Sequence, residues 1–374
     1  MTDALHFSDP LALLEDYDFE LPAASIAQQA LPERDRARLM VIERETGTIL
    51  QSGADHQVRD LSRWLRAGDL LVVNATRVVP AKLLGTKRSG GAAEALLLGR
   101  DPVAPGDFRA LLKCTGRVRE GLELIFGPPP GLTAQVVSRQ DRGEVSLRFA
   151  PGVDPYSAGQ APLPPYIRRP RTETDPERER SDLDRYQTVY AREPGAIAAP
   201  TAGLHLTDEL LERLEAAGVG RAEVVLHVGA GTFRPLDAEA LESGRLHAES
   251  YTLPVETAEV IERTRRAGGR VIAVGTTTTR VLESCVNEHG RLQPGQGETR
   301  LFVRPGGPPV RVVDALLTNF HLPRSSLLML VAALIGREPL LAAYARAVQS
   351  GFRFYSYGDA MLIVPRASET GGPR

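Results

Sequence analysis

Six short segments between residues 195 and 363 place Gly, Thr, His and Asn directly after apolar runs that are typical of strands. Their sequences are GAIAAPTAGLHLT (195–207), LHVGAGTFRP (226–235), HAESY (247–251), VIAVGTTTTR (271–280), VVDALLTNFHLP (312–323) and FRFYSYGDAMLI (352–363). Four of the seven histidines of the chain, His205, His227, His247 and His321, lie in these segments. Enzymes with α/β folds carry reactive side chains outside the carboxyl ends of their strands. The pattern therefore predicts one enzyme active site.

Two of these histidines are placed to transfer protons. His205 precedes an expected helix and His321 follows an expected strand. Imidazole titrates near neutral pH, so both are candidates for general acid–base catalysis. Three carboxylates, Glu249, Asp314 and Asp359, are candidates to orient a base or to act as one, and ordinary ion pairing is an equal alternative for each. We predict a catalytic set of both histidines with Asp314 and Asp359.

Two Gly-containing turns are expected to bind a ligand. VIAVGTTTTR predicts a buried strand, a sharp turn at Gly275 and a helix whose first turn offers hydroxyl and N–H groups to a carboxylate or phosphate. Helix capping by Thr is the alternative. LHVGAGTF lacks the third Gly of a dinucleotide fingerprint, and residues 233–235 (Phe-Arg-Pro) interrupt the helix that should follow, so no nicotinamide or flavin is expected. The predicted substrate-binding residues are Thr201, His227, Gly229, Gly231, Thr276, Thr277 and Asn319.

Composition limits the kinds of partner. A formal net charge of −2 over 374 residues argues against binding of polyanions over the whole surface and leaves room for a local basic patch. The candidates for RNA contact are Arg77, Arg168, Arg169 and Arg280, although charged segments are often only solvated. No HxH, HxxxH or acidic cluster is present, so no metal site is expected. The N-terminal region lacks the pattern of a signal peptide and no apolar run is long enough for a membrane span, which predicts a cytoplasmic protein.

The elements expected along the chain indicate an α/β fold class. Residues 68–154 consist of short β-rich segments separated by Gly, Pro and Asp turns, which is typical of an antiparallel barrel. From residue 200 onward strands alternate with helices, one capped by Thr207, others near 257–267 and 280–288, and one beginning at Ser325. We expect a mixed-sheet α/β catalytic domain formed by residues 1–67 and 155–374, with residues 68–154 as an inserted antiparallel β-barrel-like domain.

Taken together, the motifs resemble a known family. YDFELPAASIAQQALPERDRARLMV (17–41), GDLLVVNATRVVPAKLLG (68–85), LPPYIRR (163–169), RYQTVYAREPGAIAAPTAGLHLT (185–207) and the later segments are similar, in the same order, to the S-adenosylmethionine:tRNA ribosyltransferase-isomerase family of queuosine biosynthesis. The resemblance implies an α/β domain with an inserted β-barrel-like domain.

The resemblance also implies a reaction. The ribose of S-adenosylmethionine moves to the aminomethyl group of 7-aminomethyl-7-deazaguanine in tRNA and rearranges, which gives epoxyqueuosine-tRNA, adenine and methionine. S-adenosylmethionine is then a consumed substrate and no cofactor is expected. We expect the partners to be this donor and tRNA, with no membrane, and the protein to be a monomer.

Two other classes of function remain open from the residues. A methyltransferase that uses the same donor is disfavoured, because no strand is followed by the Gly-rich loop and acidic ribose ligand of such a fold. A non-catalytic RNA-binding protein does not explain the histidines at strand ends. Transfer of label from the donor methyl group to RNA favours the first, and tRNA binding without turnover of the donor favours the second.

Overall fold

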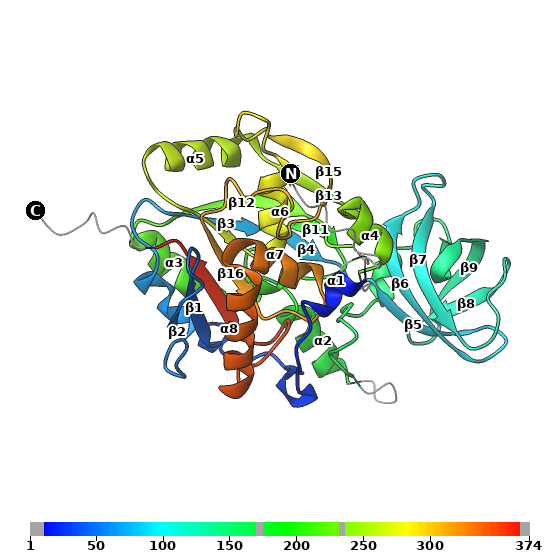
Figure 1. Ribbon diagram of the computed structural model, residues 1–374. Coiled ribbons are helices and arrows are strands. Elements are labelled where there is room, and N and C mark those ends of the chain that lie inside the picture. The colour runs from blue at the N-terminus through cyan, green and yellow to red at the C-terminus, as the bar shows by residue number, and fades with distance from the viewer. Residues whose placement is uncertain (1–10, 170–174, 230, 232–235, 367–374) are drawn as a thin grey trace, which may run out of the picture.

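A nine-stranded mixed sheet forms the centre of the structure, a computed structural model that describes residues 11–169, 175–229, 231 and 236–366 (Figure 1). In spatial order its strands are β15 (Gly295–Leu301), β13 (Arg245–Leu253), β12 (Gly220–Leu226), β3 (Leu70–Asn74), β14 (Val271–Val274), β16 (Ala315–Asn319), β17 (Ala360–Val364), β1 (Leu39–Glu43) and β2 (Ile49–Gln51). β12, β3, β14 and β16 are mutually parallel, whereas β17 is antiparallel to β16. The carboxyl ends of four strands therefore meet the amino end of β17 at one edge.

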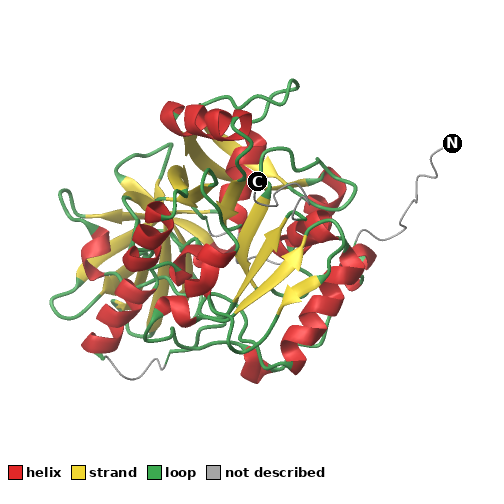
Figure 2. Cartoon of the chain, turned by 90° about the vertical axis from the view of Figure 1, so that its left-hand side faces the viewer, coloured by secondary structure: helices red, strands yellow, loops and turns green. Residues whose placement is uncertain are grey.

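Both faces of this sheet are buried, which explains why its central strands are apolar throughout. Side chains alternate between the faces, so Leu70 and Val72 pack on one side and Leu71 and Val73 on the other. The first face is covered by α5 (Val255–Arg266), α6 (Thr276–Ser284), α7 (Ser326–Ile335) and α8 (Arg337–Gln349). The second is covered by α3 (Asp208–Ala216) and the 3-10 helix η3 (Val58–Arg63). Figure 2 shows helices on both sides of the strands, so the main body has three layers.

Six antiparallel strands close into a barrel beside the main body (Figure 1). They are β5 (Lys82–Lys87), β6 (Ala92–Arg100), β7 (Asp107–Cys114), β8 (Glu123–Phe126), β9 (Leu132–Arg139) and β10 (Glu144–Phe149). The barrel has its own apolar core, in which Leu83, Leu97 and Phe126 are buried. An α/β body with an antiparallel barrel was the fold class expected from the sequence, and it is confirmed.

The expected start of the barrel region at residue 68 needs correction. β3 lies at the centre of the nine-stranded sheet, and β4 (Thr76–Val78) pairs with β11 (Glu193–Ala196) instead of with a barrel strand. All five residues of β3 are buried. A strand buried on both faces is typical of the middle of a parallel sheet. Its short apolar sequence nevertheless resembles the sequences of the barrel strands that follow it along the chain.

Local helix signals were confirmed where they depend on capping. The Thr207 side chain accepts a hydrogen bond from the N–H of Leu210 at 3.1 Å, and Ser325 accepts one from Leu328 at 3.2 Å. The helix expected near 280–288 instead begins at Thr276, directly after Gly275, which adopts a left-handed φ of 88°. The other helices are α1 (Ala12–Glu15), α2 (Pro176–Arg185) and α4 (Ala238–Ser243), and the remaining 3-10 turns are η1 (Ala23–Ser25), η2 (Arg34–Arg36), η4 (Asp141–Gly143), η5 (Pro155–Ala158) and η6 (Thr201–His205).

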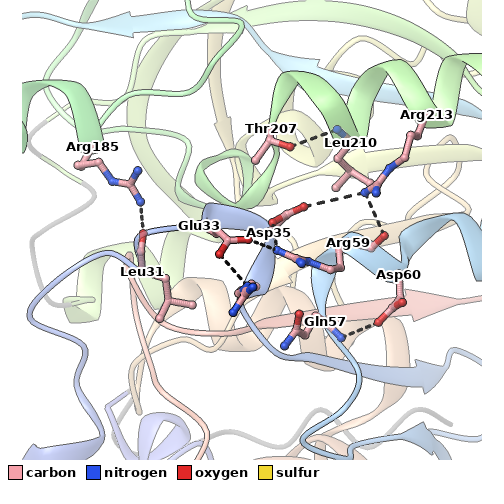
Figure 3. Close-up of polar contacts among 11 residues, drawn as sticks. Leu31, Glu33, Asp35, Gln57, Arg59, Asp60, Arg185, Thr207, Leu210 and Arg213 are labelled. Atoms are coloured by element: carbon pink, nitrogen blue, oxygen red, sulfur yellow. Dashed lines mark hydrogen bonds and ion pairs between the residues drawn. The ribbon is translucent and has the colours of Figure 1, made fainter.

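Polar contacts fasten the N-terminal segment to α3, as Figure 3 shows. Arg59 of η3 contacts Glu33 at 2.8 Å and Asp35 at 2.7 Å. Arg213 of α3 approaches the same Asp35 at 3.9 Å. Because η6 leads directly into α3, this network also holds η6 against the sheet.

Among the described residues, no single helix is long and apolar enough to cross a membrane. The consecutive helices Ser326–Ile335 and Arg337–Gln349 together have the length and composition of a membrane span, but the pair is bent by 114°.

Candidate active site

The edge where the parallel strands end opens into a cavity of about 560 Å³. Its walls come from η6, the start of α6, the end of β16, β13, α4 and the turn at residues 355–356. The structure thus brings together parts of all six segments singled out in the sequence. Seven predicted site residues line the cavity: Thr201, Gly231, Thr276, Thr277, Arg280, Asn319 and His321. The neighbouring residues 230 and 232–235 lie outside the described part of the chain.

The start of α6 forms one wall of this cavity. Gly275 turns the chain sharply out of β14, and no side chain caps the helix. Thr278 and Thr279 donate their hydroxyls to backbone carbonyls one turn earlier, whereas Thr276 and Thr277 line the cavity. An uncapped helix start presents unpaired N–H groups and the positive end of the helix dipole. This wall is therefore suited to a carboxylate or phosphate.

His321 also lines the cavity and lies just past β16. Its Nε2 is 2.8 Å from the Thr318 hydroxyl, and its backbone N–H donates to the Tyr344 hydroxyl at 2.8 Å. Burial lowers the pKa of His321 to about 3. The imidazole is therefore neutral at physiological pH.

His205 lies on the other side of Asn319. Its Nε2 is 3.0 Å from the Asn319 amide nitrogen, and it lines a separate small cavity together with Arg34 and Arg353. Burial lowers the pKa of His205 to about 4, and the charge of Asp359 only partly offsets this effect. The structure thus separates the two predicted acid–base histidines, and only His321 reaches the large cavity.

The two predicted catalytic carboxylates do not fit a role in proton transfer. Asp314 precedes β16 and so lies at the opposite edge of the sheet, where it accepts the N–H of Val271 at 2.8 Å. Asp359 is at the correct edge, but it accepts the N–H groups of Arg38 at 3.0 Å and Arg353 at 2.8 Å and pairs with both guanidinium groups. Each carboxylate thus accepts hydrogen bonds from backbone N–H groups within the fold.

His227 and the Gly pair have structural partners. The Nδ1 of His227 is 2.7 Å from the Thr76 hydroxyl, and His227 is not among the residues that line the cavity. Burial lowers the pKa of His227. The N–H of Gly229 donates to Glu249 at 3.2 Å. A Cβ at Gly231 would lie 2.9 Å from His247, so close packing requires glycine there.

Arg280 was predicted to contact RNA, and the structure instead buries it in the cavity wall. Its guanidinium pairs with Glu249, and its Nε donates to the Leu301 carbonyl at 3.1 Å. The remaining nitrogen, Nη2, is buried and has no hydrogen-bond partner among the described residues. Arg280 thus belongs to the cavity lining, not to an exposed surface of the described residues.

The other predicted RNA-contacting residues divide into two kinds. Arg77 and Arg168 are exposed and make no ion pair with another described residue. Arg169 forms a bidentate ion pair with Asp182, with hydrogen bonds of 2.8 and 2.7 Å. The charge of Arg169 is therefore already compensated within the fold.

Sequence reasoning missed several cavity residues. Arg245 and Arg300 line the cavity with exposed side chains. Tyr166 and Tyr355 also line it, and their rings stack with centroids 4.3 Å apart. The LPPYIRR and FRFYSYGD motifs contained both tyrosines, but no sequence signal showed that the two rings meet.

The described residues contain no group of three or more His, Cys, Asp or Glu side chains able to hold a metal ion.

Comparison with known proteins agrees with this architecture. The family model described as queuosine biosynthesis protein matches residues 14–363. A protein of Syntrophotalea carbinolica named S-adenosylmethionine:tRNA ribosyltransferase-isomerase is 49% identical over 94% of this chain and 99% of its own length. The protein of the same name from Thermus thermophilus is 48% identical over 94% of this chain and 99% of its own length.

A solved structure matches as well. The crystal structure of an S-adenosylmethionine tRNA ribosyltransferase from Thermotoga maritima aligns with a TM-score of 0.52 and 35% identity, covering 93% of this chain and 100% of that one. Nearly full-length matches in sequence and in structure confirm the resemblance seen in the motifs. This chain belongs to the S-adenosylmethionine:tRNA ribosyltransferase-isomerase family, the transferase-isomerase enzymes of queuosine biosynthesis.

Proposed function

We propose that the protein transfers and isomerises the ribosyl group of S-adenosylmethionine onto 7-aminomethyl-7-deazaguanine in tRNA. The products are epoxyqueuosine-tRNA, adenine and methionine. The observation that carries this proposal is the single cavity in which an uncapped helix start, a neutral His321 and the unpartnered Arg280 nitrogen meet. The names of the relatives support the same reaction.

The size and polarity of the cavity suit the donor. A volume of about 560 Å³ falls within the range of about 300–1,000 Å³ that is usual for small-molecule sites. We place the carboxylate of the methionine portion at the α6 wall, near Thr276, Thr277 and Arg280. The sulfonium and ribose then extend toward His321.

The reaction needs proton transfers and no external electrons. The bond from ribose to adenine and the bond from carbon to the methionine sulfur break, so that adenine leaves with a proton and methionine keeps the electron pair of the carbon–sulfur bond. A carbon–nitrogen bond forms to the aminomethyl group, a carbon–carbon bond between the two terminal ribose carbons closes the cyclopentane ring, and the ribose ring oxygen moves from one ribose carbon to another to form the epoxide. The sulfonium charge acidifies the neighbouring carbon, so a neutral imidazole can act as the base either there or at the attacking amine. We assign this role to His321 and propose that no resident cofactor or metal takes part.

Binding of tRNA is proposed to involve local cations, because the whole chain has a formal net charge of −2. Arg245 and Arg300 are exposed at the cavity and can attract phosphates near the modified base. Arg77 and Arg168 stay candidates for more distant contacts. The barrel adjoins the cavity through α4, since Arg142 approaches Asp237 at 3.9 Å. We further propose that the protein is cytoplasmic, because tRNA and the donor are cytoplasmic molecules. We also propose that it is a monomer.

The proposal is tested with purified protein, S-adenosylmethionine and tRNA that carries the aminomethyl base. We expect free adenine and methionine to appear only when all three are present, with the tRNA mass increasing accordingly. Methylated RNA together with S-adenosylhomocysteine would instead identify a methyltransferase. Binding of the tRNA without any turnover of the donor would identify an RNA-binding protein.

A further inference from the structure

The amide of Asn319 has a fixed orientation at the end of β16. Its nitrogen donates to the backbone carbonyl of Tyr355 at 2.9 Å. A carbonyl oxygen only accepts hydrogen bonds, so the amide nitrogen and not the amide oxygen must face Tyr355. The second N–H of the same amide points to Nε2 of His205 at 3.0 Å. Both donors of the amide are therefore used within the protein.

The amide oxygen of Asn319 is left without a partner. It is buried, and no described residue donates to it, although Asn319 lines the large cavity and is only 2% exposed. Buried polar atoms almost always have a hydrogen-bond partner, because the desolvation cost is otherwise not offset. An acceptor held in this way is ready for a donor that arrives in the cavity.

The backbone that fixes Asn319 is strained. Tyr355 has a φ of 70°, which residues other than glycine rarely adopt. Its N–H donates to the Phe320 carbonyl at 3.1 Å, and its ring stacks on Tyr166. Strained backbone of this kind gathers at functional sites, where surrounding contacts maintain it. Here the strain directs the Tyr355 carbonyl at the Asn319 amide.

His205 contributes the second fixed acceptor. Because the Asn319 amide donates to Nε2, the proton of the neutral ring lies on Nδ1. Burial, together with the positive charges of Arg353 and Arg34, lowers the pKa of His205 to about 4, and the opposing effect of the Asp359 charge is smaller than that of burial. His205 therefore keeps its acceptor at neutral pH.

We propose that the Asn319 oxygen accepts a hydrogen bond from an N–H group of a substrate, and that His205 is a positioning residue that holds Asn319 and carries no proton in the reaction. This inference rests on the proposed function. The N–H group belongs either to the donor, as an amino group of S-adenosylmethionine, or to the aminomethyl-deazaguanine base. Both sources offer the same chemistry.

The main experiment compares four variants by steady-state kinetics with varied donor and varied tRNA. Asn319→Ala should lower kcat/KM by about 10- to 100-fold, because one hydrogen bond to substrate is lost. His205→Gln keeps an acceptor for the Asn319 amide and should stay within about 3-fold of wild type, whereas His205→Ala should fall by about 10-fold. His289→Ala, on an exposed turn, is the matched control and should leave activity unchanged.

The kinetic pattern identifies the source of the N–H group. A higher KM for S-adenosylmethionine, with weaker donor binding by calorimetry in the absence of tRNA, places it on the donor. A higher KM for tRNA alone places it on the base. Equal losses of about 100-fold or more in His205→Gln and His205→Ala, with loss of one limb of the pH profile, would show that His205 transfers a proton and would overturn the inference.

A second measurement does not depend on activity. Nitrogen-15 NMR of the histidine-labelled wild-type protein reports which ring nitrogen carries the proton, and the His205 signal is the one missing from His205→Gln. A proton on Nδ1 supports the inference and a proton on Nε2 overturns it. If wild type releases no adenine, the proposed function fails. If wild type is active and Asn319→Ala matches it in kcat and both KM values, only this inference fails.

Discussion

Glu249 and Arg280 form a buried ion pair that joins β13 to α6 in the wall of the cavity, with 6% and 7% of their side chains exposed. The pair leaves one guanidinium nitrogen of Arg280 without a partner among the described residues. The same pair therefore stabilises the fold and forms part of the cavity wall.

Removing the carboxylate should destabilise the protein, because the buried charge of Arg280 then loses its compensation. Glu249→Gln is expected to lower the free energy of unfolding by about 3–5 kcal/mol. Glu223→Gln is the matched control, since its partner Arg192 is 63% exposed, and it should cost less than about 1 kcal/mol. Urea unfolding of both variants measures the difference. Equal losses in the two variants would contradict the role of burial.

His321 is expected to carry the proton transfer. His321→Gln keeps a polar group near Thr318 but cannot exchange a proton near neutral pH, so the single-turnover rate should fall by about 10²-fold or more. The affinity for tRNA should stay the same, as measured by titration. His289→Gln serves as the control. An unchanged single-turnover rate in His321→Gln would remove this assignment.

Stability should depend on pH through the buried histidines. The folded-state pKa values of His205 and His321, about 4 and about 3, lie below the ordinary histidine value of 6.5. Below pH 6.5 the unfolded chain binds protons that the folded protein does not take up. The stabilisation is therefore complete above pH 6.5 and is lost as the pH falls toward 4 and then 3, by at most about 1.4 kcal/mol per pH unit for each histidine.

The check is urea unfolding between pH 7.5 and 5 on wild type and His321→Gln. The variant should lose stability less steeply with falling pH, by about 1.4 kcal/mol per pH unit in the lower part of this range. Parallel curves for the two proteins would show that His321 is protonated in the folded state.

The exposed cavity arginines should control the salt dependence of tRNA binding. Arg300→Gln or Arg245→Gln should weaken tRNA binding and flatten the slope of log affinity against log salt by about 0.7–0.9 for each lost phosphate contact. Arg77→Gln and Arg168→Gln are tested in the same way. Arg169→Gln should keep the slope and lower the melting temperature, because Arg169 pairs with Asp182. A slope that is the same in all four exposed variants would remove this RNA-binding surface.

Turnover should survive exhaustive chelation. The described residues offer no metal-binding group, and the proposed reaction needs only proton transfers. The measurement is adenine release before and after treatment with a strong chelator, followed by addition of single metals. Activity that is lost in chelator and restored by one metal would refute the expectation.

Signals of short range could be read from the sequence alone. Thr207 and Ser325 marked the starts of α3 and α7, because a cap depends only on residues within one turn. Gly275 marked the turn out of β14, because its left-handed φ excludes most other residues. The alternation of strands and helices predicted the α/β body, and the motif order identified the family.

Strand direction and pairing decided which predicted residues lie at the cavity and which sheet each strand joins. Asp314 and Asn319 lie at the two ends of the same strand, β16, yet only Asn319 lies at the edge where four parallel strands end. Spacing along the chain carries no information on which edge a strand end will occupy. For the same reason, the sequence alone led us to assign β3 to the barrel region. Its run of buried apolar residues is compatible with a strand of either sheet.

Contacts between distant segments assigned the roles of the polar residues. His205 and Asn319 lie 114 positions apart, and the fold brings their side chains within hydrogen-bond distance of each other. Arg280 was expected at the surface and is buried because Glu249, 31 positions away, supplies the opposite charge. The sequence by itself determined which side chains gather at the strand ends. Only the tertiary structure decided which of them face the cavity, because burial and partner choice depend on how the segments pack.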